Sequence, residues 1–470
     1  CCPLHYSFVS MSMSLPFVDR SSSSLPVQLV AQPRWRSWLQ EQSAAHRGWI
    51  ESSGVAGNAG DLALLPGRDG KAAGAVLVLS AEPSLWDFGA LATKLPAGTW
   101  RLASKTAPVS PTDAAVAIGL GTWRFERYRA QKAKPGARLL WPEGADKARA
   151  KAMIEAIFLA RDLITTPSSD MGPAELAAAA RDLAKAHKAT FKAIVGDDLL
   201  KRNYPMVHAV GRASARAPRL IDLTWGNLRH PKVTLVGKGV CFDTGGLDIK
   251  PADGMRNMKK DMGGAAHALA LAGLVMAQRL PVRLTLLVPA VENAIGPEAY
   301  RPGEVVATRA GVSVEIDNTD AEGRVVLCDA LAYAGESKPA LIMDFATLTG
   351  AARIALGPDL PALFANDDAL AAEWLAAGER TRDPVWRMPL WRPYLRYLTS
   401  HVADLANAGS RMAGAVTAAL YLERFVPDGT AWAHLDTYAW NDSSRPGHPA
   451  GGEALGLRSA WALLKARYGG

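Results

Sequence analysis

Short apolar segments alternate with amphipathic ones along most of the chain. After residue 160, apolar runs predict strands at 190–195, 219–224, 232–236, 282–288 and 340–344. Segments with helical spacing lie between several of these runs, at 173–187, 263–279 and 325–334. This alternation predicts a mostly parallel sheet with helices on both faces, in which functional side chains gather at the carboxyl ends of strands.

The first third of the chain has a similar but less regular pattern. It predicts strands at 74–79 and 99–102 and helices at 84–95 and 113–132. A broken polar stretch follows, and 147–163 then has continuous helical spacing. We therefore predict a smaller N-terminal α/β domain over 25–145, a linker helix over 146–166 and a larger α/β domain over 167–470. Residues 1–24 lack the positive start of a secretory signal, and we expect a disordered or mis-started leader.

Composition narrows the class of protein. The chain has 470 residues, of which 49% are hydrophobic, and no uninterrupted apolar run reaches the roughly 18 residues that a membrane helix needs. The four cysteines, Cys1, Cys2, Cys241 and Cys328, have neither disulfide-framework nor zinc-ribbon spacing, so we expect a reducing, cytoplasmic compartment. The net charge of +8 is a mild basic excess that permits nucleic-acid binding without requiring it.

Four acidic residues follow predicted strands or begin predicted helices. They are Asp243, Asp261, Asp320 and Glu322. If these strand ends are neighbours, the four acids meet at one place, and like charges in a poorly solvated pocket need cations to neutralise them. Two divalent ions in a mainly oxygen ligand field would do so and would activate a water; magnesium, manganese and zinc all suit such a field.

Basic residues accompany these acids. Lys238 would either repel the cations or bind one through its nitrogen, whereas Lys250 could stay charged and stabilise an oxyanion. Arg324 could hold an anion such as a carboxylate or bicarbonate. Lys259 and Lys260, beside Asp261, can be read as a solvated loop, and His267 on an apolar helix as a packed core histidine.

Several segments together resemble the leucine aminopeptidases, which are cytosolic exopeptidases with two metal ions. The resemblance rests on NTDAEGR (318–324), VGKGVCFDTGG (236–246), KKDMGGAA (259–266), DFATLTGAA (344–352), GAVTAALYLERFV (414–426) and WAHLDTYAWN (432–441). It covers the chain from about residue 160 to the end and is weak over 1–140. The ending of the last segment departs from the family's usual residues, which puts the side-chain preference in question more than the chemistry.

The resemblance implies a role for each matching position. One ion would be held by Asp243, Asp320 with its carbonyl, and Glu322, and the other by Lys238, Asp243, Asp261 and Glu322. Lys250 would polarise the scissile carbonyl, and Arg324 would bind the bicarbonate that serves as general base. Peptide-binding positions would be Thr347, Leu348 and Gly350, with Met258 in the wall of the first-residue pocket.

The resemblance also implies substrates and assembly. The substrates would be short peptides that begin with leucine or another apolar residue. The ions would be zinc or manganese, with magnesium or cobalt as possible replacements, and the protein would assemble as a homohexamer. Two alternatives remain at this stage. One is a DNA-binding regulatory protein with the same fold, which would use the basic excess, and the other is a different two-metal hydrolase such as a phosphatase.

Overall fold

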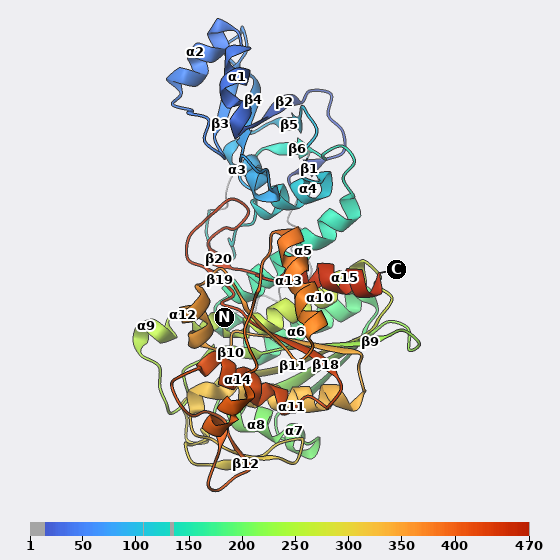
Figure 1. The fold of residues 1–470 in the computed structure, drawn as a ribbon, viewed down its shortest axis with the longest axis vertical. Helices are drawn as coiled ribbons and strands as arrows, with labels where there is room; N and C mark the ends of the chain where they lie inside the picture. Colours follow the sequence, from blue (N-terminus) through green and yellow to red (C-terminus); the bar gives the residue numbers. More distant parts are fainter. Residues whose placement is uncertain (1–14, 107, 132–135, 470) are drawn as a thin grey trace. The chain divides into compact units, whose positions relative to one another are not determined.

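A computed structural model describes residues 15–106, 108–131 and 136–469 of the chain. It divides into two compact units, shown together in Figure 1. The smaller holds the described residues up to Phe158 together with Asp442–Ala450, and the larger holds Leu159–Asn441 and the chain from Gly451 onward. The sequence-based division placed 442–450 in the larger domain. No described helix is long and apolar enough to cross a membrane.

The smaller unit is built on a sheet with the strand order β1-β6-β5-β2-β4-β3. Its strands are β1 (Phe17–Val18), β2 (Leu25–Ala31), β3 (Leu62–Pro66), β4 (Ala72–Leu79), β5 (Thr99–Leu102) and β6 (Arg138–Leu140). Its helices are α1 (Trp35–Gln40), α2 (Ala44–Ser52), α3 (Leu91–Lys94) and α4 (Pro111–Leu120), and the boundary between the units falls within α5 (Lys147–Thr165). Only β3 runs antiparallel to its neighbour.

Three sequence expectations for this unit are wrong in detail. The expected leader includes β1, which pairs with β6 and stacks Phe17 on Trp141, although residues 1–14 lie outside the described residues. The helix expected over 84–95 is broken at Gly89, where a Cβ would lie 2.4 Å from the Gly447 nitrogen. The helix expected over 113–132 ends at Leu120, and a Cβ on the next residue, Gly121, would lie 1.7 Å from the Gly89 carbonyl oxygen. At Gly89 and Gly121 the backbones of separate segments meet without side chains between them, and helical periodicity does not register such contacts.

The larger unit contains the main sheet, in the order β16-β15-β18-β14-β9-β11-β8-β7, with β10 paired to β11. Its strands are β7 (Thr190–Val195), β8 (Arg219–Trp225), β9 (Lys232–Gly237), β10 (Gly239–Asp243), β11 (Arg283–Asn293), β14 (Leu341–Ala346), β15 (Ala362–Ala365), β16 (Trp386–Arg387) and β18 (Ala431–Asp436). The central pairs are parallel, while β8 is antiparallel to β7 and β11, and β15 to β18. The predicted α/β fold with a mostly parallel central sheet is confirmed.

Helices cover both faces of this sheet (Figure 1). One layer holds α6 (Pro173–His187), α10 (Gly263–Ala277), α13 (Asp368–Thr381) and α15 (Leu457–Tyr468), and the other holds α8 (Pro205–Gly211), α11 (Glu322–Glu336) and α14 (Gly414–Glu423). Shorter elements are α7 (Asp198–Lys201), α9 (Ala252–Met255), α12 (Gly350–Leu356), β12 (Val305–Ala307), β13 (Ser313–Glu315), β17 (Leu405–Ala406), β19 (Trp440–Asn441) and β20 (Gly451–Gly452).

Helix α10 lies deepest, because it is apolar on every side and nearly all of its residues are buried. Its first turn can approach the sheet this closely because glycines lie at the contact points, Gly264 in the helix and Gly237 in β9. A Cβ on Gly264 would lie 2.0 Å from the Phe345 carbonyl oxygen in β14, and a Cβ on Gly237 would lie 2.6 Å from the Ala265 Cα. This close contact fixes the start of α10 against the carboxyl ends of β9 and β14.

Candidate active site

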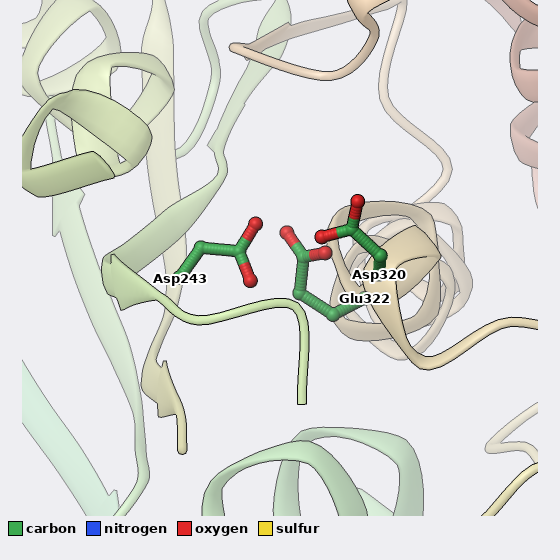
Figure 2. Close-up of side chains that lie close together, drawn as sticks. All are labelled: Asp243, Asp320 and Glu322. Carbon is green, nitrogen blue, oxygen red and sulfur yellow. The ribbon is translucent and has the colours of Figure 1, made fainter. Parts of the chain in front are cut away.

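Three carboxylates converge at the carboxyl ends of the central strands. Asp243 ends β10, Asp320 lies in a 3-10 turn, and Glu322 begins α11. Figure 2 shows their carboxylates gathered in one place. One oxygen from each carboxylate lies within 4.8 Å of the other two. The strand-to-helix connections bring them together, since segments that are far apart in sequence end at one edge of the sheet.

Asp261, the fourth acid, reaches this group through Lys238. The Lys238 ammonium lies 2.7 Å from Asp261 Oδ2 and 2.7 Å from Glu322 Oε1, and it donates a hydrogen bond to the Thr347 carbonyl. Asp261 itself accepts a hydrogen bond of 2.8 Å from Thr347 Oγ1. Lys238, Asp261 and Glu322 are all buried. The structure therefore places Lys238 between two acids at the floor of the site.

Lys250 contacts the other two acids of the group, Asp243 and Asp320, from the more exposed side. Its ammonium lies 2.8 Å from Asp243 Oδ2 and is ion-paired with Asp320. Asn293, at the end of β11, donates a hydrogen bond of 2.8 Å to Asp243 Oδ1 and another to the Thr319 carbonyl. One amide thus links the end of β10 to the turn that carries Asp320.

The protonation of these groups follows from their crowding. Burial and the neighbouring charge of Asp243 raise the pKa of Asp320 to about 6 and hold that of Glu322 well above its ordinary range. Burial acts to lower the pKa of Lys238, but Asp261, Glu322 and Asp243 together raise it. The negative charges of these buried carboxylates repel one another, and the two lysines do not fully neutralise them. A bound cation would remove this repulsion.

Arg324 lies in the first turn of α11, two residues after Glu322, and its side chain is also buried. Its Nη1 donates a hydrogen bond of 3.0 Å to the Asn407 carbonyl, and its Nε has no hydrogen-bond partner among the described residues. Burial lowers the pKa of its guanidinium, although an arginine stays charged near neutrality. An incompletely paired, buried guanidinium is suited to binding a small anion.

The loop between β14 and α12 forms another wall with Thr347 and Leu348, and Gly350, the first residue of α12, continues it. Asp436, at the end of β18, holds this loop by accepting hydrogen bonds from Leu348 N at 2.9 Å and from Thr349 Oγ1 at 2.6 Å. Because the Leu348 amide hydrogen is already used, a peptide hydrogen bond at this residue has to involve its carbonyl.

Apart from Asn293, which supports Asp243 from behind, the site residues described above line one cavity of about 470 Å³. Met258 also lines it, as do Lys260, Arg353 and Tyr438. The reading of Lys259 and Lys260 as a solvated loop is wrong for Lys260, which is 5% exposed. His267, expected in the core, is buried and its ring nitrogens lie within hydrogen-bond distance of the Gly263 and Leu455 carbonyls.

Sequence reasoning missed three polar residues of the site, Asn293, Asp436 and Lys260. Asn293 and Asp436 each end a strand, so the strand-end rule that selected Asp243 could have selected them too. The sequence carried no signal for the partners that they bind, because those partners lie tens of residues away along the chain.

The residues fit two divalent cations. Apart from the Lys238 ammonium, Asp261 Oδ2 and Glu322 Oε1 have no hydrogen-bond partner among the described residues, although both oxygens are buried. Together with Asp243 and Asp320 they form an oxygen-rich ligand set, which suits magnesium, manganese or zinc. Such a site can activate water and bind a carbonyl oxygen, which is hydrolytic chemistry.

Comparison with known proteins gives a consistent result. The family described as "Cytosol aminopeptidase family, catalytic domain" matches residues 158–460, and "M17 aminopeptidase, N-terminal domain" matches residues 25–142. A probable cytosol aminopeptidase of Roseiflexus castenholzii is 42% identical over 364 residues, which are 74% of each chain.

Solved structures agree over nearly the full length. The cytosol aminopeptidase of Coxiella burnetii has a TM-score of 0.92 and 49% identity, covering 96% of this chain and 99% of its own. A bottromycin maturation enzyme, solved in complex with Mn, has a TM-score of 0.86 and 34% identity, covering 95% of this chain and 100% of its own.

Proposed function

The chain belongs to the cytosol aminopeptidase family, and from this premise we propose that it releases leucine or another apolar first residue from short peptides. Membership makes it a metal-dependent aminopeptidase. The convergence of Asp243, Asp320 and Glu322 within 4.8 Å is the observation that carries the site assignment. The names of the relatives described above do not mention DNA binding, and the regulatory alternative has no support.

We propose that Asp243, Asp320 and Glu322 hold one divalent ion and that Lys238, Asp261 and the two shared carboxylates of Asp243 and Glu322 hold the other. We propose that both ions are zinc or both are manganese, and that magnesium or cobalt can replace them. The Mn bound in the related maturation enzyme supports manganese. When bound, such ions lower the pKa of a water and polarise the substrate carbonyl.

The other residues of the site would bind and orient the peptide and hold the group that accepts a proton from water. Lys250 is at the edge of the cavity, where its ammonium can donate to the oxygen that becomes negative as the peptide carbonyl is attacked. Arg324 is the proposed anchor for bicarbonate as the general base, which its buried, partly unpaired guanidinium supports. Thr347, Leu348 and Gly350 would hold the peptide backbone, and Met258 would contact the first side chain.

Asp320→Asn tests this assignment, because it keeps the shape of the side chain and removes its charge. Hydrolysis of leucine anilide should fall by at least about a thousandfold, since polarisation by an ion contributes several kcal/mol and each 1.36 kcal/mol is tenfold. Chelator treatment should abolish the activity of the unmodified enzyme, and Mn or Zn should restore it. Asp253→Asn, an exposed acid of α9, is the matched control and should keep full activity.

An Asp320→Asn protein with undiminished activity would contradict the assignment of the site. A panel of first residues, each assayed with Zn, Mn, Mg and Co, measures the proposed preference for leucine and the metal. We also propose a cytoplasmic homohexamer, as the resemblance to the leucine aminopeptidases implies. Light scattering that gives the mass of a monomer at working concentration would exclude the hexamer.

A further inference from the structure

Lys260 is a buried cation at the wall of the cavity. The residue is 5% exposed, yet it lines the cavity together with Met258 and Asp261. Among the described residues its ammonium makes no hydrogen bond and no ion pair. Its Nζ is not one of the fully buried unpaired side-chain atoms, so the ammonium reaches the cavity, where an anionic partner outside the protein can bind it.

The nearest acids are already engaged by other groups. Asp261 faces Lys238 and Thr347, and Asp436 accepts its hydrogen bonds from the loop between β14 and α12. What remains beside the Lys260 ammonium is the ring of Tyr438, 4.6 Å away at its centroid. A cation–π contact contributes about 0.5–2 kcal/mol, less than the penalty for burying an ammonium.

A second positively charged side chain, that of Arg353, lies over the ring of Tyr438. The guanidinium carbon of Arg353 lies 5.0 Å from the Tyr438 centroid, and Arg353 is exposed and lines the cavity. Like Lys260, Arg353 forms no ion pair among the described residues. One side of the cavity therefore presents a buried and an exposed positive charge around one aromatic ring, and no acid in the described part of the chain forms an ion pair with either.

We propose that Lys260, with Arg353 and Tyr438, forms a binding site for a carboxylate of the peptide substrate. The carboxylate would accept hydrogen bonds from the Lys260 ammonium inside the cavity and be attracted by Arg353 at its mouth. Two sources have this chemistry: the side chain of a first aspartate or glutamate, and the C-terminal carboxylate of a very short peptide. The second source is compatible with an apolar first residue.

This inference rests on the proposed aminopeptidase function and narrows its substrates. Two pairs of substrates test it in the metal-loaded enzyme. Glutamyl and glutaminyl anilides differ only in the charge of the first side chain, and leucylglycine and its amide differ only in the charge at the C-terminus. For each pair the measured quantity is the ratio of kcat/KM for the charged substrate to that for the neutral one.

Lys260→Met removes the charge and keeps most of the length of the side chain. It should lower the ratio by about tenfold for at least one pair, the factor that corresponds to the weaker end of a hydrogen bond to a charged group. Arg353→Gln, at an exposed position that the fold does not depend on, should lower the same ratio by a smaller factor. Lys259→Met is the matched control and should leave the ratio unchanged, because Lys259 bonds to the Thr165 carbonyl and does not line the cavity.

A fall confined to the anilide pair assigns the carboxylate to the first side chain, and a fall confined to the dipeptide pair assigns it to the C-terminus. Ratios that stay the same for both pairs in Lys260→Met and Arg353→Gln overturn the carboxylate site while leaving the aminopeptidase intact. If Lys260→Met does not fold, the ratio of Arg353→Gln decides alone. An unmodified enzyme that hydrolyses none of the four substrates overturns the proposed function itself.

Discussion

Replacing Asp436 by alanine tests whether this buried residue positions the wall of the cavity. Asp436 touches none of the proposed metal ligands directly; its carboxylate accepts hydrogen bonds from Leu348 N at 2.9 Å, Thr349 N at 3.3 Å and Thr349 Oγ1 at 2.6 Å. These bonds hold the start of the loop between β14 and α12. Alanine would leave the three donors without their acceptor.

The size of the effect follows from the two shorter bonds. Each hydrogen bond to a charged group is worth about 1.5 kcal/mol at the low end, so about 3 kcal/mol of loop positioning is lost. If the peptide needs the loop in place during the reaction, kcat/KM for leucine anilide falls by about a hundredfold. Asp436→Asn keeps an acceptor oxygen and should lose about tenfold.

The assay has to separate positioning from metal loss and from general instability. Bound metal, measured by elemental analysis, should stay at the unmodified level in both Asp436 variants. Asp367→Ala removes a comparable carboxylate that caps α13 through the Leu370 amide and does not line the active-site cavity, so it should cost stability but not kcat/KM. Wild-type kcat/KM in Asp436→Ala would refute the reasoning.

Two further predictions concern stability. Glu453→Gln should cost about 3–5 kcal/mol in urea unfolding, because it removes the counter-ion of fully buried Arg161, and replacing both residues by methionine should recover most of it. Burial raises the pKa of Asp329 to about 7 in the folded protein, whereas an aspartate in the unfolded chain releases its proton near pH 4. Between these two values the folded state binds a proton that the unfolded state does not, so the stability of the protein falls as the pH rises. The stability of Asp329→Asn relative to the unmodified protein should therefore increase from pH 5 to pH 8; a relative stability that decreases contradicts the buried protonation.

The sequence predicts best where local chemistry alone decides the element. Helix α6 begins and ends at the predicted residues, because Pro173 starts it, Glu175 accepts from the Gly172 amide, and Lys188 ends it in the left-handed region. Strand β7 likewise spans the predicted 190–195.

Predictions weaken where backbones from distant segments meet. The breaks at Gly89 and after Leu120 depend on close approaches that helical periodicity does not record. The strand-end rule selected the acids that the structure brings together, although their roles stay predictions. The burial of Lys260 could not be read from its sequence neighbours, since a Lys-Lys pair before a helix is normally solvated.

The break between β9 and β10 has a consequence for how specificity can diverge in a fold of this kind. Up to Gly237 the chain pairs with β14, and after Lys238 it pairs only with β11. The Lys238 amide donates a hydrogen bond to the Phe345 carbonyl, and the Lys238 carbonyl accepts one from the Ala265 amide. The floor of the cavity is therefore fixed by main-chain bonds that most substitutions cannot alter. Its upper wall consists of side chains from separate segments, among them Met258, Arg353 and Tyr438. If the proposed function holds, substitutions in this wall can change the selectivity for peptides one position at a time, while the cluster of acids beneath it stays the same.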